Sequence, residues 1–201
     1  ETVLANLRGD TEIIAVCDGA WADPPIPDHP RVQLVYWPQP IGQRAATNMA
    51  AKLSRARYLM KLDAHCSVDE GFDVKLIAAD EELGRPDVTQ IPRMFNLHAF
   101  NRRCKACGHE MYQGPMNAVC DKCKTAAGFE RAMVWKPRRG TKTEFWRFDH
   151  ELHFQYWNDF KRRPEAQGEL VDVMSSIGAS FFMRRDRFVE LGGLDEQHGS
   201  W

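Results

Sequence analysis

The sequence lacks the features that most quickly assign a chain to a class. No apolar run approaches the roughly 20 residues that span a bilayer, and no secretory signal is visible at Glu1. Neither sign of charge dominates, because 27 Lys and Arg face 28 Asp and Glu, so no global field favours nucleic acid or membrane as a partner. Internal repeats and low-complexity tracts are missing too. These absences leave one globular domain with room for a substantial core.

Cysteine is scarce and unevenly placed. Of the six cysteines, four form two Cys-x-x-Cys pairs, whereas Cys17 and Cys66 stand apart. Pairs with this spacing favour metal binding over a disulfide framework and predict a reducing, cytoplasmic setting. The chain also lacks an initiator Met at Glu1 and stops at Trp201 without a closing element. We therefore expect a piece that is truncated at both ends.

The two cysteine pairs predict a structural zinc site. They are Cys104 with Cys107 and Cys120 with Cys123, and Gly108 follows the first pair, where a tight knuckle needs a permissive backbone. Four thiolates complete a tetrahedral site for which Zn²⁺ is the default ion, with iron or a redox dithiol as alternatives. Because protein would fill all four positions, the zinc ribbon would serve the fold of an insertion too short to fold alone.

Basic residues flank the cysteine pairs on both sides. They are Arg102, Arg103 and Lys105 before the ribbon and Lys136, Arg138, Arg139 and Lys142 after it. Such flanks allow contact with phosphates or with an acidic partner. A solvated charged face is the interpretation that we favour from the sequence.

Strand and helix patterns alternate over the first ninety residues. Continuous apolar runs predict buried strands, and apolar residues at helical spacing predict helices. The segments in order are Glu12–Cys17, Val32–Trp37, Gln43–Arg55, Tyr58–Leu62 and Phe72–Leu83. Further strands are expected over Val88–Met94, Arg131–Lys136 and Met174–Met183, and a short helix over Arg184–Leu191. This alternation predicts a mainly parallel sheet with helices on its faces.

The strand Tyr58–Leu62 ends in Asp63-Ala64-His65. If the segment stays extended, Asp63 and His65 project to the same side and can reach one small object. A carboxylate and an imidazole suit a divalent cation such as Mn²⁺, and ligands of parallel α/β sheets bind beyond the carboxyl ends of strands. On the sequence alone, a solvated or locally hydrogen-bonded pair is the alternative.

The stretch from Glu144 to Phe160 is rich in aromatic residues. We favour a core role for it over an acceptor platform on which sugars stack. His150 and His153 have no partner at ligand spacing and are not expected to form a second metal site. Cys66 is interpreted as a buried bystander thiol and Cys17 as strand core.

Taken together, these segments resemble the nucleotide-sugar glycosyltransferases of the GT-A fold, with family-2 enzymes as the general match. The run Leu62-Asp63-Ala64-His65-Cys66 is similar to one in the polypeptide N-acetylgalactosaminyltransferases. The other matching parts are the strand end Asp18-Gly19, the helix start Ile41-Gly42-Gln43-Arg44 to Asn48, and the segment from Phe182 through Glu196. The resemblance covers residues 1 to about 90 and about 174 to 201. It implies a GT-A, Rossmann-like α/β fold with the zinc ribbon inserted.

The resemblance implies roles for individual residues. Asp63 and His65 would hold a catalytic Mn²⁺ or Mg²⁺ that neutralises charge on the leaving nucleoside diphosphate. Asp18 would contact the nucleoside, although it could instead cap its own turn. The remaining donor contacts would come from Arg44, which could equally be an exposed helix residue, and from Asn48, Gly178 and Ala179. Asp195 and Glu196 lie toward the acceptor side, but neither matches the usual base, which is expected beyond Trp201 together with a third metal ligand.

The predicted function is therefore a metal-dependent glycosyltransferase, or a fragment of one, with a UDP-linked sugar as the expected donor. The acceptor could be a glycan, a protein or a small molecule, and a nucleic-acid partner is not expected. We expect a nucleotide-sugar-binding half over 1–95, the ribbon over 96–130 and the acceptor side over 131–201. Two alternatives stay open: a zinc-ribbon nucleic-acid-binding protein, and a degenerate transferase that acts as a binding module.

Overall fold

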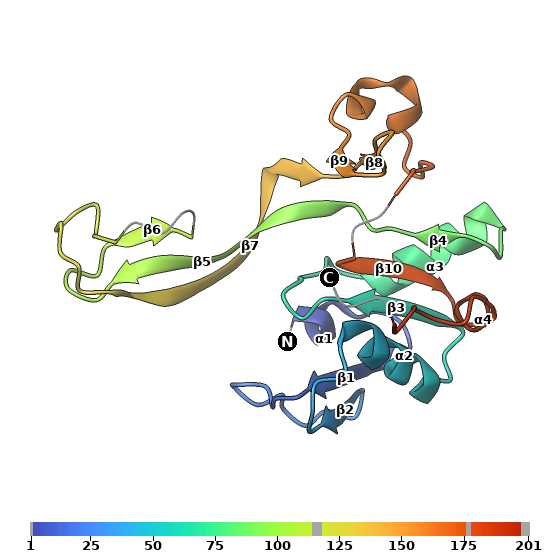
Figure 1. The fold of residues 1–201 in the computed structure, drawn as a ribbon, viewed down its shortest axis with the longest axis horizontal. Helices are drawn as coiled ribbons and strands as arrows, with labels where there is room; N and C mark the ends of the chain where they lie inside the picture. Colours follow the sequence, from blue (N-terminus) through green and yellow to red (C-terminus); the bar gives the residue numbers. More distant parts are fainter. Residues whose placement is uncertain (1, 114–117, 176–177, 198–201) are drawn as a thin grey trace. The chain divides into compact units, whose positions relative to one another are not determined.

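The computed structural model describes residues 2–113, 118–175 and 178–197, without the side chains of 139–143, and forms two compact units (Figure 1). The first unit comprises the described parts of 1–92 and 176–201, and the second comprises those of 93–175. This division differs from the boundaries expected from the sequence, because residues 131–175 belong with the cysteine-bearing segment. The reason is that the strand after the cysteines pairs with the strand before them.

The first unit is mixed α/β. Its elements in chain order are α1 (Thr2–Asn6), β1 (Ile13–Asp18), β2 (Val32–Trp37), α2 (Gln43–Leu53), β3 (Tyr58–Leu62), α3 (Phe72–Leu83), β4 (Thr89–Gln90), β10 (Ser180–Arg184) and α4 (Arg185–Glu190). β1 and β2 pair in parallel, from Ile13 opposite Val32 to Asp18 opposite Trp37. Helix α2 packs on β1 and buries Ala46. The predicted elements from Glu12 to Leu83 and the short helix after Arg184 are confirmed within two residues, whereas β4 and β10 are shorter than the strands predicted over Val88–Met94 and Met174–Met183.

The prediction of a mainly parallel sheet is corrected by the second sheet of this unit. Its strand order is β3-β10-β4, and β10 runs antiparallel to both neighbours. In the described residues, β1 and β2 form the only parallel pair. After β4 the chain leaves for the second unit and returns as β10, so the direction of β10 is set by that excursion. Strand–helix alternation carries no information about such a return.

The second unit contains mostly antiparallel strands. Its elements are β5 (Met94–Cys104), β6 (Glu110–Tyr112), β7 (Phe129–Thr143), β8 (Trp146–Phe148), β9 (Phe154–Tyr156) and the 3-10 turns η1 (Phe160–Arg162) and η2 (Pro164–Ala166). β5 and β7 form a long ribbon with β6 beside β5, and the cysteine pairs lie in the turns at its end (Figure 1). β8 and β9 form a hairpin. Beyond it, Phe145, Phe160 and Ala166 are buried together against Trp157 and Val171.

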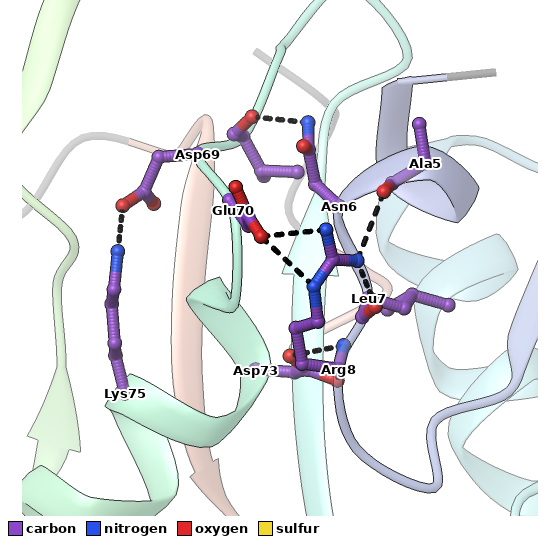
Figure 2. A network of polar contacts seen from close by, with 9 residues as sticks. Ala5, Asn6, Leu7, Arg8, Asp69, Glu70, Asp73 and Lys75 are labelled. Carbon is purple, nitrogen blue, oxygen red and sulfur yellow. Dashed lines mark hydrogen bonds and ion pairs between the residues drawn. The ribbon is translucent and has the colours of Figure 1, made fainter.

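A polar network at the start of α3 fixes the chain between α1 and β1 (Figure 2). Asp73, only 4 % exposed, accepts hydrogen bonds from the backbone N–H groups of Arg8 and Gly9 and from the Thr11 hydroxyl. The Arg8 guanidinium pairs in turn with Glu70. Burial raises the pKa of the Asp73 carboxyl, but its hydrogen bonds outweigh burial and hold that pKa below the usual value.

The Asp73 network predicts an acid-sensitive stability of the first unit. Because the folded pKa lies below the unfolded one, the contribution is fully present above the unfolded value of 3.8 and is lost as the pH falls through the folded pKa. We expect Asp73→Asn to lower the free energy of unfolding at neutral pH by about 1–3 kcal/mol and to flatten the acid dependence. Urea unfolding followed by amide hydrogen exchange in α3 measures both.

Asp69→Asn is the matched control for Asp73→Asn. Asp69 is an exposed carboxylate four residues earlier, and its ion-pair partner Lys75 is exposed as well. Its replacement should change stability by less than about 0.5 kcal/mol. An equal acid dependence in wild type and Asp73→Asn would contradict the assignment.

Candidate functional site

The four cysteines of the tetrad lie on two knuckles with the same backbone geometry. The N–H of Cys104 donates to the carbonyl of His109, and the N–H of Gly108 donates back to Cys104. The second knuckle repeats this pattern with Cys120, Thr125 and Lys124 at the equivalent places. Gly108 and Lys124, each four residues after the first cysteine of its pair, both adopt positive φ angles of 69° and 57°. Two matching turns thus present four sulfurs to one point.

The spacing of the sulfurs fits a tetrahedral metal site. The Cys104 and Cys123 sulfurs are 3.7 Å apart, as are those of Cys107 and Cys120, and all four lie within 4.8 Å of one another. A zinc ion with ligands at about 2.3 Å sets tetrahedral edges of about 3.8 Å. The tetrad can therefore bind a metal such as zinc. All four positions would be filled by protein, which suits a structural site.

The protonation of the tetrad depends on a cation. Hydrogen bonds from the hydroxyl and N–H of Thr125 lower the pKa of the Cys123 thiol to about 6. The N–H of His109 lowers the pKa of Cys107, but burial and the neighbouring sulfurs outweigh it and raise that pKa to about 11. Four adjacent thiolates repel one another, so a divalent cation is needed to hold them all deprotonated.

The carboxyl end of β3 forms a second polar cluster. β3 ends at Leu62, and Asp63 to Cys66 form a turn in which the N–H of Cys66 donates to the Asp63 carbonyl over 3.0 Å. The sequence interpretation assumed an extended segment here, but the structure has a turn. The turn still brings the His65 imidazole to 3.8 Å from the Asp63 carboxylate, with the His65 side chain 82 % exposed. Octahedral ligands at about 2.1 Å lie about 3–4 Å apart, so this separation fits two positions around a divalent cation.

Two residues that sequence reasoning missed hold the Asp63 carboxylate. The Lys61 ammonium, whose side chain is 9 % exposed, contacts Asp63 Oδ1 and also the carbonyl of Gly178. The Gln43 side-chain amide at the start of α2 donates to the same Oδ1 over 2.9 Å. Residues i and i+2 of a strand share a face, and this was the signal that could have paired Lys61 with Asp63.

The loop before β10 closes this cluster from the other side. The N–H of Asp63 donates to the carbonyl of Ala179 over 2.9 Å, so Gly178 and Ala179 lie beside the end of β3. Positions 176 and 177 lie outside the described residues. Asp63 is thus approached by three segments: its own strand, the start of α2 and the loop that leads into β10.

Asp18 links the end of β1 to the start of helix α2. Its two carboxylate oxygens accept the N–H groups of Ile41 and Gly42 over 2.7 and 3.0 Å. Gly19 has a φ of 81°, and a Cβ there would lie 2.6 Å from the Pro40 ring, so the turn requires glycine. Asp18 therefore positions the segment before α2, and its predicted contact with a nucleoside stays a prediction.

Arg44 and Asn48 face the segment after α4. Arg44 donates to the carbonyl of Asp195 over 3.2 Å. The Asn48 amide is buried; it donates to the Leu194 carbonyl and to Glu196, and its oxygen accepts the Leu194 N–H. These bonds occupy most of the capacity of Asn48. Its expected role in a nucleotide pocket remains a prediction, as does that of Arg44.

The aromatic stretch divides into buried and exposed residues. Phe145, Trp146 and Phe160 are buried, whereas Phe148, Phe154 and Tyr156 are 45 %, 44 % and 67 % exposed.

His150 and His153 are both exposed. The tetrad is the only group of three or more metal-ligating side chains in the described residues. Burial raises the pKa of the Cys66 thiol, and the nearby Asp63 raises it further.

A small cavity of about 200 Å³ lies beside β1. It is lined by Cys17, Trp21, Ala22, Pro25, Ile26 and Leu34. Pockets for drug-sized ligands are usually 300–1,000 Å³, so this cavity is too small for a nucleotide sugar. Next to it, the exposed ring of Trp21 stacks on Tyr36 with centroids 4.1 Å apart.

Comparison with known proteins leaves the function open. No protein-family model matches the chain, and no curated protein sequence matches it either. No helix in the described ranges is long and apolar enough to cross a membrane.

Proposed function

We propose that the chain is part of a metal-dependent glycosyltransferase related to the GT-A nucleotide-sugar enzymes. The observation that carries the proposal is the convergence at Asp63. Gln43 of α2 and the Gly178–Ala179 loop, which are far apart in sequence, both bond to Asp63 or its neighbour Lys61. The sequence resemblance gives these segments the roles of nucleotide helix, metal element and donor-sugar loop.

Asp63 and His65 would hold Mn²⁺ or Mg²⁺, and the remaining positions would be filled by the donor and by ligands outside the described residues. A cation there would neutralise charge on the leaving nucleoside diphosphate. Lys61 already supplies one positive charge to Asp63, so a divalent ion must displace the ammonium from that oxygen or bind the other one. A displaced Lys61 would be available to supply its positive charge to a phosphate of the donor.

Calorimetry with a panel of nucleotide sugars tests the proposal. The zinc-loaded chain is titrated with UDP-sugars first, in the presence of Mn²⁺ and in a parallel experiment without added Mn²⁺. Loss of a residue that only supports a metal ligand costs about 10–100-fold in metal affinity. Asp63 would be a ligand itself, so Asp63→Ala should weaken Mn²⁺-dependent binding by more than about 100-fold. Asp69→Ala, which removes an exposed carboxylate of the following loop, serves as the control.

Unchanged donor binding in Asp63→Ala would overturn the metal assignment. Failure of every nucleotide sugar to bind the wild-type chain with Mn²⁺ would overturn the transferase proposal for this chain.

A further inference from the structure

Charge is strongly segregated along the chain, although its total is near zero. Residues 93–143, here called the basic ribbon, contain 11 of the 27 Lys and Arg residues but only 3 of the 28 Asp and Glu residues, a net charge of +8. The rest of the chain carries 16 basic and 25 acidic residues, a net charge of −9. Zinc bound by four thiolates adds −2, so the loaded ribbon keeps about +6. The balanced total conceals this local excess.

Two of the three acidic residues of the basic ribbon are paired within it. Glu110 and Glu130 both pair with Arg103, at 2.8 and 3.4 Å. Other cations of the ribbon are exposed: Lys105, Lys122, Lys124, Arg131, Lys136 and Arg138. In the described part of the chain, no carboxylate lies within ion-pair distance of Lys105, Lys122 or Lys136. The outward charge of the ribbon is therefore positive around the cysteine knuckles and along β7.

Arginine and aromatic side chains alternate on one face of this ribbon. The register places Phe100 opposite Met133 and Arg102 opposite Arg131, so these four share a face. The Arg131 guanidinium lies 4.9 Å from the centre of the Phe100 ring. On the opposite face, which Tyr112 shares with its partner Asn101, Arg138 lies 4.8 Å from the centre of the Tyr112 ring, which is 41 % exposed. Guanidinium–aromatic pairs of this kind offer flat surfaces on which bases stack.

A bulge in β7 exposes a tryptophan beside this face. Between the pairs His98–Lys136 and Phe100–Met133, β5 has one residue and β7 has two. Trp135 lies in that bulge with a φ of 50°, a conformation that bulky residues rarely adopt, and it is 39 % exposed. Bulges re-aim side chains, and strain of this kind collects at functional positions. The indole is therefore presented to solvent within the most basic part of the chain.

We propose that the basic ribbon binds nucleic acid, with lysines on the phosphates and Trp135 stacked on a base. A two-stranded ribbon is narrow enough to enter the major groove of a duplex, and exposed aromatics suit single strands. An acidic protein or an anionic membrane could use the same charges and the indole, but the guanidinium–aromatic pairs beside it favour stacked bases. The inference does not depend on the proposed transferase activity, because the binding assay needs neither nucleotide sugar nor Mn²⁺.

The test is fluorescence anisotropy of labelled single-stranded DNA, duplex DNA and RNA with the zinc-loaded full chain over a range of salt. Replacing Lys105, Lys122 and Lys136 together with Gln should make the negative slope of log K against log salt less steep by about 2.7 for duplex DNA. Each phosphate contact contributes about 0.9 to the steepness of that slope. Trp135→Ala should weaken single-strand binding about 5- to 100-fold and leave the slope unchanged.

The control removes three exposed cations outside the basic ribbon, Lys52, Arg55 and Arg85, also as Gln. Zinc content is measured for every variant, and Lys136→Gln, which lies away from both knuckles, carries the test if the triple variant loses zinc. Absence of nucleic-acid binding at about 50 mM salt, where phosphate contacts are strong, would overturn the proposal. So would equal losses in the ribbon and control triples, or tighter binding of polyglutamate or anionic vesicles than of any nucleic acid.

Discussion

Cys120→Ser is expected to abolish stoichiometric zinc binding and to unfold both cysteine knuckles. Cys120 is fully buried, at 0 % exposed, and its sulfur lies 3.7 Å from that of Cys107. A structural zinc site contributes an apparent 10–16 kcal/mol in isolated zinc-finger peptides at neutral pH, far more than the knuckles can gain from their own contacts. Losing one thiolate leaves three ligands and an open position. Metal analysis by mass spectrometry and amide exchange of Gly108 and Lys124 measure the two effects.

The size of this effect follows from how little else is buried at the end of the ribbon. Between Cys104 and Gly128, the buried hydrophobic side chains in the described residues are Cys104, Met111 and Cys120. Two of these three are ligands themselves, so the metal takes the place of a core. Removing zinc with a strong chelator should therefore expose the same amides as Cys120→Ser does, and adding zinc back should restore them.

Cys66→Ser is the matched control, because Cys66 lies outside the tetrad, next to His65. It should leave the zinc content and the knuckle amides unchanged. A Cys120→Ser chain that kept one equivalent of zinc with protected knuckle amides would contradict the site. Co²⁺ substitution gives a further measure, because thiolate-to-metal absorption should be present in wild type and in Cys66→Ser and lost in Cys120→Ser.

How far the sequence predicts this molecule depends on how local each feature is. The cysteine tetrad could be predicted because two short motifs with fixed spacing each form their own turn. The elements β1, β2, α2, β3 and α3 follow from apolar patterns within single segments. The parallel β1–β2 pair agrees with the expected parallel arrangement, although a loop and not a helix joins these two strands. The antiparallel entry of β10 was not predicted, since it depends on where the chain goes between residues 93 and 175.

The candidate site shows the same limit. Asp63 was singled out from its place after an apolar strand, and the resemblance assigned Gly178 and Ala179 to a donor-sugar loop without predicting their bonds to Lys61 and Asp63. Lys61 was not predicted, because a lysine within a strand normally points its charge to solvent. Here its ammonium is retained under the loop by the Gly178 carbonyl. The partners of Asn48 also lie far off in sequence, around Leu194.

Asp80→Ala is expected to destabilise the first unit by about 3–5 kcal/mol, the usual cost of breaking a buried ion pair from one side. Asp80 on α3 is 1 % exposed and accepts hydrogen bonds from Tyr58 of β3 over 3.0 Å and from Arg184 of β10 over 2.9 Å. The carboxylate therefore joins a helix to two strands of the β3-β10-β4 sheet. The hydrogen bond with Asp80 raises the pKa of the Arg184 guanidinium. When Asp80 is replaced, Arg184 stays charged but has lost this partner.

Comparison of Asp80→Ala with two other variants separates the buried charge from ordinary helix effects. Glu81→Ala changes an exposed carboxylate on the same helix and should alter stability by less than about 0.5 kcal/mol. Tyr58→Phe removes one hydrogen bond while Arg184 still satisfies the carboxylate, so a loss of about 1 kcal/mol is expected. Urea unfolding of the three variants, followed by exchange of the β3 amides, gives the ranking.

The decisive measurement is the double variant Asp80→Leu with Arg184→Met. If most of the loss in Asp80→Ala comes from the unpaired Arg184 charge, replacing both partners by apolar side chains should recover much of the stability. Equal losses in the single and double variants would mean that packing, and not charge, dominates. Tyr58 pairs with Arg184 at one end of the β3–β10 pair, and Leu62 pairs with Ser180 at the other, next to Asp63. The folded fraction of Asp80→Ala should therefore retain the Asp63 turn, so that loss of stability and loss of metal binding can be measured separately.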